Sequence, residues 1–199
     1  MTHANPGIRM VQHFERLAEA AGQVAERLGP DIDTYAEWAL TTLRAGGRLL
    51  FCGNGGSATT AEHVATEYLI RFRRRRVPLP AIALTLSTGM LTASANDFGF
   101  EQVFVRPLTA LGRPGDLLVL HSTSGESLNV LAVARAAAEI PVRTVALVGA
   151  DGGPLADLAD HSIRVPASDT ATIQELHLAI EHVVVDYVDA WFAGEEEQE

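Results

Sequence analysis

The sequence predicts an α/β domain built on a parallel, doubly wound sheet of five strands. Short apolar runs lie at residues 49–52, 81–84, 116–120, 143–148 and 162–165. Runs of this kind are typical of parallel strands that are buried on both faces. Segments with helical spacing of apolar residues separate them, and this alternation indicates right-handed strand–helix–strand crossovers. We therefore expect helices on both faces of the sheet.

Helical segments also open and close the chain. Two amphipathic segments, 11–28 and 32–45, precede the first predicted strand, and Gly46 and Gly47 end the second of them. A last helix is predicted over 170–191. Because the two N-terminal helices are appended to a sheet domain, we expect their apolar faces to pack in an oligomer.

The composition fits one cytoplasmic domain. The chain has 199 residues, of which 47% are hydrophobic and 20% charged, so it can bury a full core. A formal net charge of -10 argues against nucleic acid as a partner. The single cysteine, Cys52, cannot form an intramolecular disulfide. No segment approaches the roughly 20 apolar residues of a membrane span, and no signal peptide is recognisable, so we expect a soluble cytoplasmic protein without a membrane partner.

Lysine is absent, because all fifteen basic residues are arginines. This absence excludes Schiff-base chemistry, lysine-anchored pyridoxal phosphate and a P-loop lysine. Five of the arginines lie at 71 and 73–76. Taken alone, such a run is more typical of a solvated face or a loop than of a binding site.

A hydroxyl-rich loop follows the third predicted strand. Residues 122–127 read Ser-Thr-Ser-Gly-Glu-Ser and precede a predicted helix over 127–138. A helix N-terminus offers unpaired N–H groups and a positive dipole end, the hydroxyls add donors, and Gly125 allows close approach. The loop therefore predicts a phosphate site, although such residues can also be plain helix caps. Glu126 would repel phosphate, so we expect its side chain to point to solvent.

A second loop, 53–57, should lie at the same edge, because parallel strands present their carboxyl ends together. The helix that follows is expected to begin with Ser57 as its N-cap. It carries His63 and Glu67 four residues apart, so both side chains lie on one face and could bind one metal ion. Plain surface pairs have the same spacing, and alone it is a weak indication.

The last predicted helix carries further polar side chains that could join such a site. They are Gln174, Glu175, His177, Glu181 and His182. His177 and Glu181 have the favourable four-residue spacing. Gln174 and His182 are eight residues apart, a rise of about 12 Å along a helix, so one ion could join them only through a frayed turn, long reach or two subunits. Spacing alone does not choose between the two pairs.

Ordered motifs cover nearly the whole chain. They are Cys-Gly-Asn-Gly-Gly-Ser at 52–57 with His63 and Glu67, the segments 78–84, 95–100 and 112–116, the loop 122–127, and Ile-Gln-Glu-Leu-His at 173–177 followed by His182. Together they resemble the phosphoheptose isomerases of the sugar isomerase (SIS) domain family. The resemblance implies a single SIS domain over 1–199, with N-terminal helices at 1–45, the sheet domain at 46–192 and an acidic tail at 193–199.

The resemblance implies an isomerase that converts sedoheptulose 7-phosphate to D-glycero-D-manno-heptose 7-phosphate through an enediol, in a homotetramer with sites near subunit interfaces. It implies one zinc ion per subunit on His63, Glu67, Gln174 and His182. Glu67 and His182 become the acid/base pair, which a proton transfer between C1 and C2 requires. The implied substrate contacts are Asn54, Gly55, Ser57, Arg71, Asn96, Asp97, Ser122, Thr123, Ser124, Ser127 and Gln174.

Three positions depart from the family pattern. Thr60 stands in place of aspartate, Thr172 in place of arginine, and Glu126 where asparagine is common. Two alternatives stay open: a non-catalytic SIS protein that regulates replication initiation through a protein partner, and an isomerase of a different sugar phosphate. Retention of all four metal-ligand positions favours the heptose enzyme. A Rossmann dehydrogenase is disfavoured, because the loop 53–57 lacks the G-x-G-x-x-G spacing.

Overall fold

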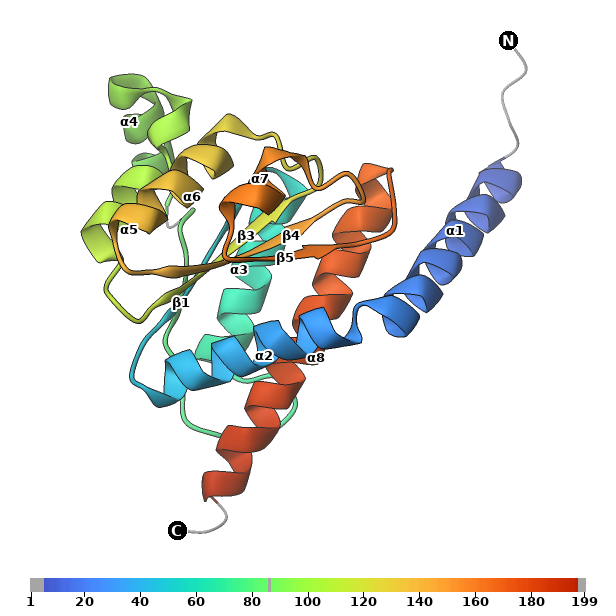
Figure 1. Cartoon of the computed structure of the whole chain (residues 1–199), viewed down its shortest axis with the longest axis horizontal. Coiled ribbons are helices and arrows are strands. Elements are labelled where there is room, and N and C mark those ends of the chain that lie inside the picture. Colours follow the sequence, from blue (N-terminus) through green and yellow to red (C-terminus); the bar gives the residue numbers. More distant parts are fainter. Residues whose placement is uncertain (1–5, 86, 197–199) are drawn as a thin grey trace.

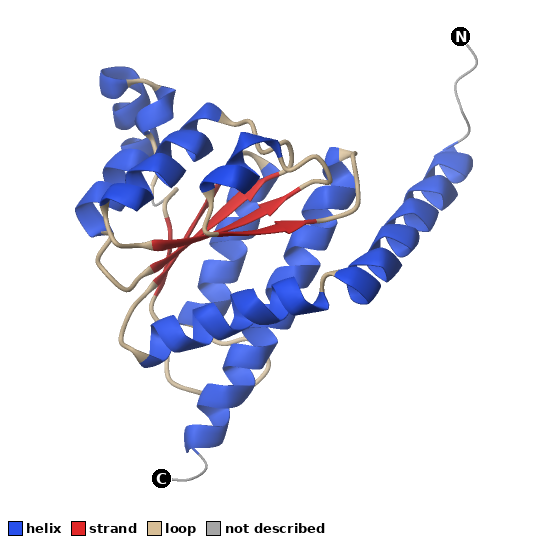
Figure 2. Ribbon diagram, in the orientation of Figure 1, coloured by secondary structure: helices blue, strands red, loops and turns tan. Residues whose placement is uncertain are grey.

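A sheet of five parallel strands forms the centre of the computed structural model, which describes residues 6–85 and 87–196 (Figures 1 and 2). The strands are β1 (Leu49–Gly53), β2 (Ala81–Ala83), β3 (Leu117–Ser122), β4 (Arg143–Val148) and β5 (His161–Arg164). Their order is β2-β1-β3-β4-β5, and every neighbouring pair is parallel. The prediction of a five-stranded, doubly wound parallel sheet is confirmed.

Eight α-helices and one short 3-10 helix connect and flank the described strands. They are α1 (Pro6–Arg27), α2 (Gly29–Arg44), α3 (Gly56–Leu69), α4 (Thr88–Phe98), η1 (Phe100–Gln102), α5 (Val105–Leu111), α6 (Leu128–Glu139), α7 (Gly153–Leu158) and α8 (Thr170–Glu196). α8 continues into the predicted acidic tail, of which residues 197–199 lie outside the described part of the chain. None of the described helices combines the length and the apolar character that crossing a membrane requires.

The core has two halves, one on each face of the sheet. Leu49 and Phe51 of β1 are buried with residues of α2, α3 and α8. Leu50 and Cys52 of the same strand are buried with residues of α5, α6 and α7. Successive side chains of a strand point to opposite faces, so an apolar run supplies both halves at once. This explains why the strands read as unbroken apolar runs in the sequence.

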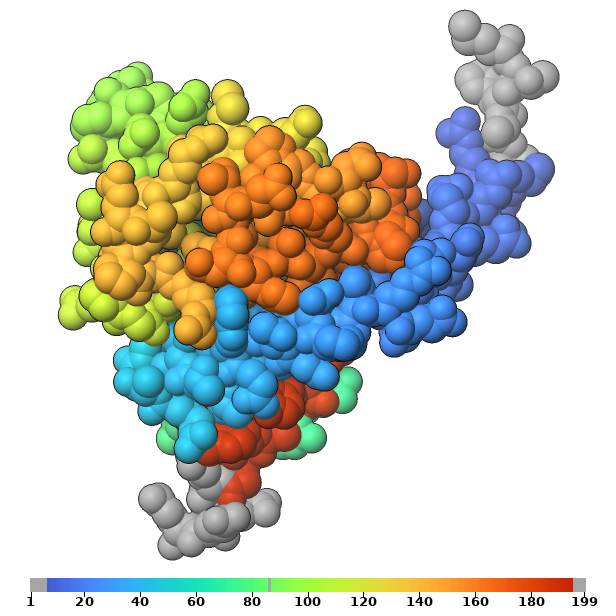
Figure 3. All heavy atoms as spheres, in the orientation of Figure 1, coloured from blue at the N-terminus to red at the C-terminus, as the bar shows by residue number. Residues whose placement is uncertain are grey.

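The helices α3 and α8 pack on the same face of the sheet and run side by side in the same direction. Gly56, at the start of α3, faces Gln174 near the start of α8, and His63 faces His182 further along both helices. In contrast, α1 (dark blue in Figures 1 and 3) extends away from the sheet. Its large apolar side chains Ile8, Met10, Val11 and Phe14 are between 49% and 60% exposed.

Candidate active site

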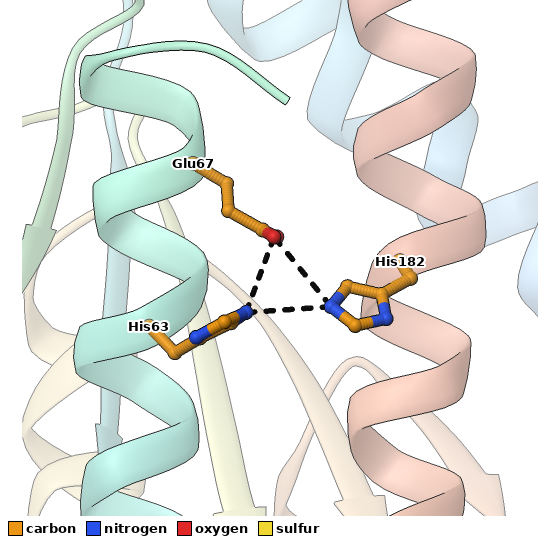
Figure 4. Close-up of side chains that lie close together, drawn as sticks. All are labelled: His63, Glu67 and His182. Atoms are coloured by element: carbon orange, nitrogen blue, oxygen red, sulfur yellow. Dashed lines mark hydrogen bonds and ion pairs between the residues drawn. The ribbon is translucent and has the colours of Figure 1, made fainter. Parts of the chain in front are cut away.

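Three side chains from α3 and α8 meet where the two helices face each other (Figure 4). His63 Nε2 lies 3.1 Å from Glu67 Oε1 and 3.4 Å from His182 Nε2, and His182 Nε2 lies 3.5 Å from Glu67 Oε1. The side chains of His63 and His182 are 52% and 36% exposed, so the cluster is open to solvent. The fold thus brings together three of the four predicted metal ligands, including both predicted catalytic residues.

The donor set of this cluster fits a zinc ion. Ligand atoms of His63, Glu67 and His182 all lie within 4.8 Å of one another. Two imidazole nitrogens and a carboxylate oxygen are typical zinc ligands. Glu67 Oε2 is buried, and no hydrogen-bond partner for it is found among the described residues. Because a buried carboxylate oxygen without a partner is unfavourable, a bound cation would satisfy a need that the described side chains leave open.

Phe72 supports one ligand of the cluster. Its ring stacks on the imidazole of His182, with centroids 5.4 Å apart and an interplanar angle of 21°. Such stacking fixes the plane of the imidazole and hence the direction of its nitrogens. Phe72 lies inside the arginine run, where no hydrophobic periodicity singles it out in the sequence.

Gln174, the fourth predicted ligand, lies elsewhere within the chain. A Cβ atom added to Gly56 would lie 2.3 Å from Gln174 Oε1, so this side chain packs against the first turn of α3. His182 is eight residues further along α8, which corresponds to about 12 Å of helix. Within one subunit, the described contacts therefore separate Gln174 from the cluster.

The hydroxyl-rich loop adopts a compact turn between β3 and α6. Ser122 ends β3, and its Oγ accepts the Gly125 N–H at 3.1 Å. Gly125 has a φ of +66°, in the left-handed region that glycine favours. Ser127 is the N-cap residue of α6 but its side chain makes no capping hydrogen bond. Glu126 is exposed, which confirms the expectation that its side chain points to solvent.

The turn after β4 packs against the hydroxyl-rich loop 122–127. The sequence pattern did not predict this contact. A Cβ atom on Gly125 would lie 2.0 Å from the Gly152 carbonyl oxygen, and one on Gly153 would lie 2.5 Å from the Ser124 carbonyl oxygen. The Leu155 N–H donates to the Gly125 carbonyl at 3.1 Å. The two turns can approach so closely only because side chains are missing there. The Gly-Gly pair at the start of α7 was the available signal.

The loop after β1 differs from prediction at the start of α3. Gly55 is the N-cap residue, with a φ of +54°, and α3 begins at Gly56. The prediction that Ser57 caps the helix is therefore wrong, because the left-handed turn at Gly55 starts the helix two residues earlier. Ser57 lies buried in the first turn.

A cavity of about 690 Å³ opens beside the two loops. Asn54, Ser127 and Asn129 line one side of it, and Phe98, Gly99 and η1 line the other. The side-chain amides of Asn54 and Asn129 donate to each other's oxygens at 2.8 Å in both directions. This pair ties the loop after β1 to the start of α6. Asn129 is a further residue that sequence reasoning missed.

The remaining predicted contacts lie on exposed segments. Arg71 is exposed in the loop after α3. Asn96 and Asp97 are exposed on α4, where the Asn96 side-chain amide donates to Asp97 Oδ1 at 2.8 Å. α4 contains no buried residue and stands at a corner of the domain (Figure 1). Among the described residues, no hydrogen bond or ion pair joins Arg71, Asn96 or Asp97 to the cluster.

The alternative pair on α8, His177 and Glu181, belongs to the core. Glu181 accepts hydrogen bonds from the Tyr35 hydroxyl at 2.8 Å and lies 2.7 Å from His121 Nε2. Tyr35, His121 and Glu181 are fully buried, and burial, reinforced by Glu181, raises the pKa of Tyr35 well above its usual value. Burial lowers the pKa of His177 to about 3, with a smaller effect from His121. Tyr35, His121 and Glu181 therefore form a buried structural network, and the ring of His177 lies against that of His121, with centroids 6.2 Å apart.

The sequence of this chain is similar to those of known proteins. Residues 12–149 match the model of the SIS domain family. A phosphoheptose isomerase of Roseiflexus sp. (strain RS-1) is 47% identical over 90% of this chain and 91% of its own. One of Methylococcus capsulatus is 46% identical over 96% of this chain and 100% of its own.

Solved structures of phosphoheptose isomerases have the same fold as this chain. The phosphoheptose isomerase of Francisella tularensis superposes with a TM-score of 0.91 at 36% identity, and that of Neisseria gonorrhoeae with 0.88 at 39%. Each alignment covers 94% of this chain and 100% of the other. On the match to the family model and on these relatives, the chain belongs to the SIS domain family.

Proposed function

We propose that this protein is an aldose–ketose isomerase that converts sedoheptulose 7-phosphate to D-glycero-D-manno-heptose 7-phosphate. The observation that carries the proposal is the His63–Glu67–His182 cluster, in which one buried carboxylate oxygen has no partner among the described residues. The names of the relatives indicate the substrate class. An isomerase acting within this class would work in the cytoplasm, where sugar phosphates are made.

The reaction needs a base and an acid on either side of a carbonyl. Moving a proton between C1 and C2 through an enediol requires one group that removes the proton and one that protonates the neighbouring oxygen. Glu67 is the proposed base, because its Oε2 is free of hydrogen bonds to described residues. His182 is the proposed acid, since its imidazole lies within 3.5 Å of the Glu67 carboxylate and is held by Phe72.

We propose that His63, Glu67 and His182 hold one zinc ion. When bound, zinc would stabilise negative charge on the substrate oxygens. Gln174 is the proposed fourth ligand. Because it lies about 12 Å along α8 from His182, we propose that it acts across a subunit interface. The exposed apolar side chains of α1 support an oligomer, proposed to be a homotetramer within which the 199-residue chain forms a single SIS domain.

The loop 122–127 is the proposed phosphate anchor. Its support comes from hydroxyls gathered at the start of α6, beside a cavity of about 690 Å³. We assign Ser122, Thr123, Ser124 and Ser127 to the phosphate, and Asn54, Gly55 and Ser57 to the substrate at the neighbouring loop. Arg71, Asn96, Asp97 and Gln174 are proposed to complete the substrate contacts, several of them from a second subunit.

The direct test is incubation of the purified, zinc-loaded protein with sedoheptulose 7-phosphate, with the aldose product followed by mass spectrometry after reductive labelling. Product that disappears on chelation of the metal and returns with zinc would support the proposal. A folded protein that binds zinc but forms no product would contradict it. Arabinose 5-phosphate, tested in parallel, distinguishes an isomerase of another sugar phosphate from a non-catalytic protein.

A further inference from the structure

Arg76, the last residue of the arginine run, forms a fully buried ion pair with Asp189. The side chains of Arg76 and of Asp189, on α8, are both 0% exposed, and Arg76 Nε donates to Asp189 Oδ1 at 2.8 Å. Buried charges persist only where they are paired and hydrogen-bonded. Neither residue is part of the proposed site, so their burial needs another explanation.

Arg76 caps the C-terminal end of α3. Its Nη2 donates to the Glu67 carbonyl at 2.9 Å, and its Nη1 donates to the Tyr68 carbonyl at 2.8 Å. The last carbonyls of a helix lack partners within the helix, and a cation there also interacts favourably with the helix dipole. The guanidinium group thus holds the backbone of the turn from which the Glu67 side chain projects.

Asp189 connects this turn to α8. Its Oδ2 accepts the backbone N–H groups of Arg73 at 3.1 Å and of Arg74 at 2.7 Å. Asp189 follows His182 by seven residues, which is about two helical turns, so both side chains lie on the α8 face toward α3. One carboxylate therefore fixes the loop after α3 to the same face that carries His182.

We propose that Arg76 and Asp189 are positioning residues that set the distance between Glu67 on α3 and His182 on α8. The pair joins the backbone of Glu67 to the His182 face through buried, charge-assisted hydrogen bonds, which are strong and directional. Small displacements of reacting or ligating groups have large effects on rate and on metal binding. The catalytic part of this inference rests on the proposed function; the part concerning metal binding does not.

The chain offers a control in a second arginine–aspartate pair, in which Asp116 is buried and the Arg48 side chain is 21% exposed. Arg48 Nη2 lies 2.7 Å from Asp116 Oδ2, and Asp116 also accepts the backbone N–H groups of Arg48 and Arg113. Arg48 caps a helix in the same way, by donating to the Leu111 carbonyl at the end of α5. Arg48 and Asp116 directly precede β1 and β3, so this pair has the same chemistry but no described contact with α3 or α8.

The experiment compares two double variants, Arg76→Met/Asp189→Leu and Arg48→Met/Asp116→Leu. Removing both charges of a pair avoids leaving one buried alone. Three quantities are measured for each variant. Cobalt(II) affinity is followed by visible absorption, and kcat and KM are determined with sedoheptulose 7-phosphate. Amide hydrogen exchange is measured in peptides that cover residues 66–70. We expect the first variant to bind cobalt about 10- to 100-fold more weakly and to lose a similar factor in kcat, with KM within about threefold. The control should stay within about twofold of the unmodified protein.

Cobalt affinity and kcat within about twofold of the unmodified protein in a folded first variant would overturn the inference, as would equal losses in the control. If the first double variant does not fold, Arg76→Lys replaces it, since an ammonium keeps the charge but loses the planar fork. If the unmodified protein binds cobalt without turnover, the proposed function fails while cobalt affinity still decides this inference. If it does not bind cobalt, faster exchange at 66–70 in the first variant alone supports the pair's role, and unchanged exchange refutes it.

Discussion

Two groups of histidine and glutamate meet α8 at neighbouring residues but have opposite characters. Glu181 and His182 are neighbours on α8. Glu181 is fully buried and satisfied by Tyr35 and His121, with distances of 2.8 and 2.7 Å. His182 faces His63 and Glu67 at the surface, where one carboxylate oxygen is left without a described partner.

The difference shows that residue type does not decide whether such a group is structural or chemical. Both groups combine imidazole with carboxylate at hydrogen-bonding distance. In the buried group each carboxylate oxygen has a partner, and no solvent reaches it. In the exposed group the two imidazoles reach solvent, and one buried carboxylate oxygen has no partner among the described residues, so the group can still take up a cation or exchange a proton.

The largest expected effect is on turnover, through Glu67. Glu67→Gln removes the proposed base while keeping the shape of the side chain, so kcat should fall by about 10²- to 10⁴-fold. Unfolding in urea should be little changed. The matched control is Glu62→Gln, five residues earlier on α3, where the carboxylate accepts a hydrogen bond from Thr85 and lies outside the cluster. Full activity in Glu67→Gln would remove Glu67 from the mechanism.

Next in size is the effect of Glu181→Leu on stability. This change leaves the Tyr35 hydroxyl and the His121 imidazole buried without their partner, so the free energy of unfolding should fall by about 3 kcal/mol. Glu181→Gln keeps an acceptor for Tyr35 and should lose about 1 kcal/mol. Urea denaturation of both variants measures this. An equal loss of stability in Glu67→Gln would erase the distinction between the two groups.

Zinc should stabilise the folded protein through the exposed group alone. At a free zinc concentration of about 100 times Kd, a single site raises the free energy of unfolding by about 2.7 kcal/mol. We expect this increase in the unmodified protein and in His121→Gln, but not in His63→Ala. Thermal or urea unfolding with and without zinc measures it. A zinc response that survives in His63→Ala and disappears in His121→Gln would assign the metal to the buried group.

The smallest expected effect, over the range between neutral pH and about pH 5, is the pH dependence of stability that comes from His177. Its folded pKa of about 3 lies below the ordinary value of 6.5, so the unfolded chain takes up a proton first as the pH falls. The contribution to stability is complete above about pH 6.5 and decreases toward pH 3, by at most about 1.4 kcal/mol per pH unit. His177→Leu should therefore lose stability less steeply than the unmodified protein between neutral pH and about pH 5 in urea titrations. Identical slopes would contradict the assignment.

Much of the fold could be predicted because burial leaves a local pattern. β4 was predicted at its observed bounds, and the other strands within two residues, since strands buried on both faces consist of continuous apolar residues. The start of α3 was missed because a glycine in the left-handed region at Gly55 replaced the side-chain cap. Likewise, the support of Gly125 by Gly152 depends on two turns that are distant in the chain.

For the candidate site, the sequence by itself determined which chemistry the chain can offer. The four-residue spacing of His63 and Glu67 places both on one helix face, and the loop 122–127 places hydroxyls at a helix N-terminus, because both relations are local. Only the tertiary structure decided that His182 joins this pair while His177 and Glu181 enter the core. Which side of α8 is buried depends on how the whole helix packs on the sheet, and that packing is set by the combined apolar contacts of the core.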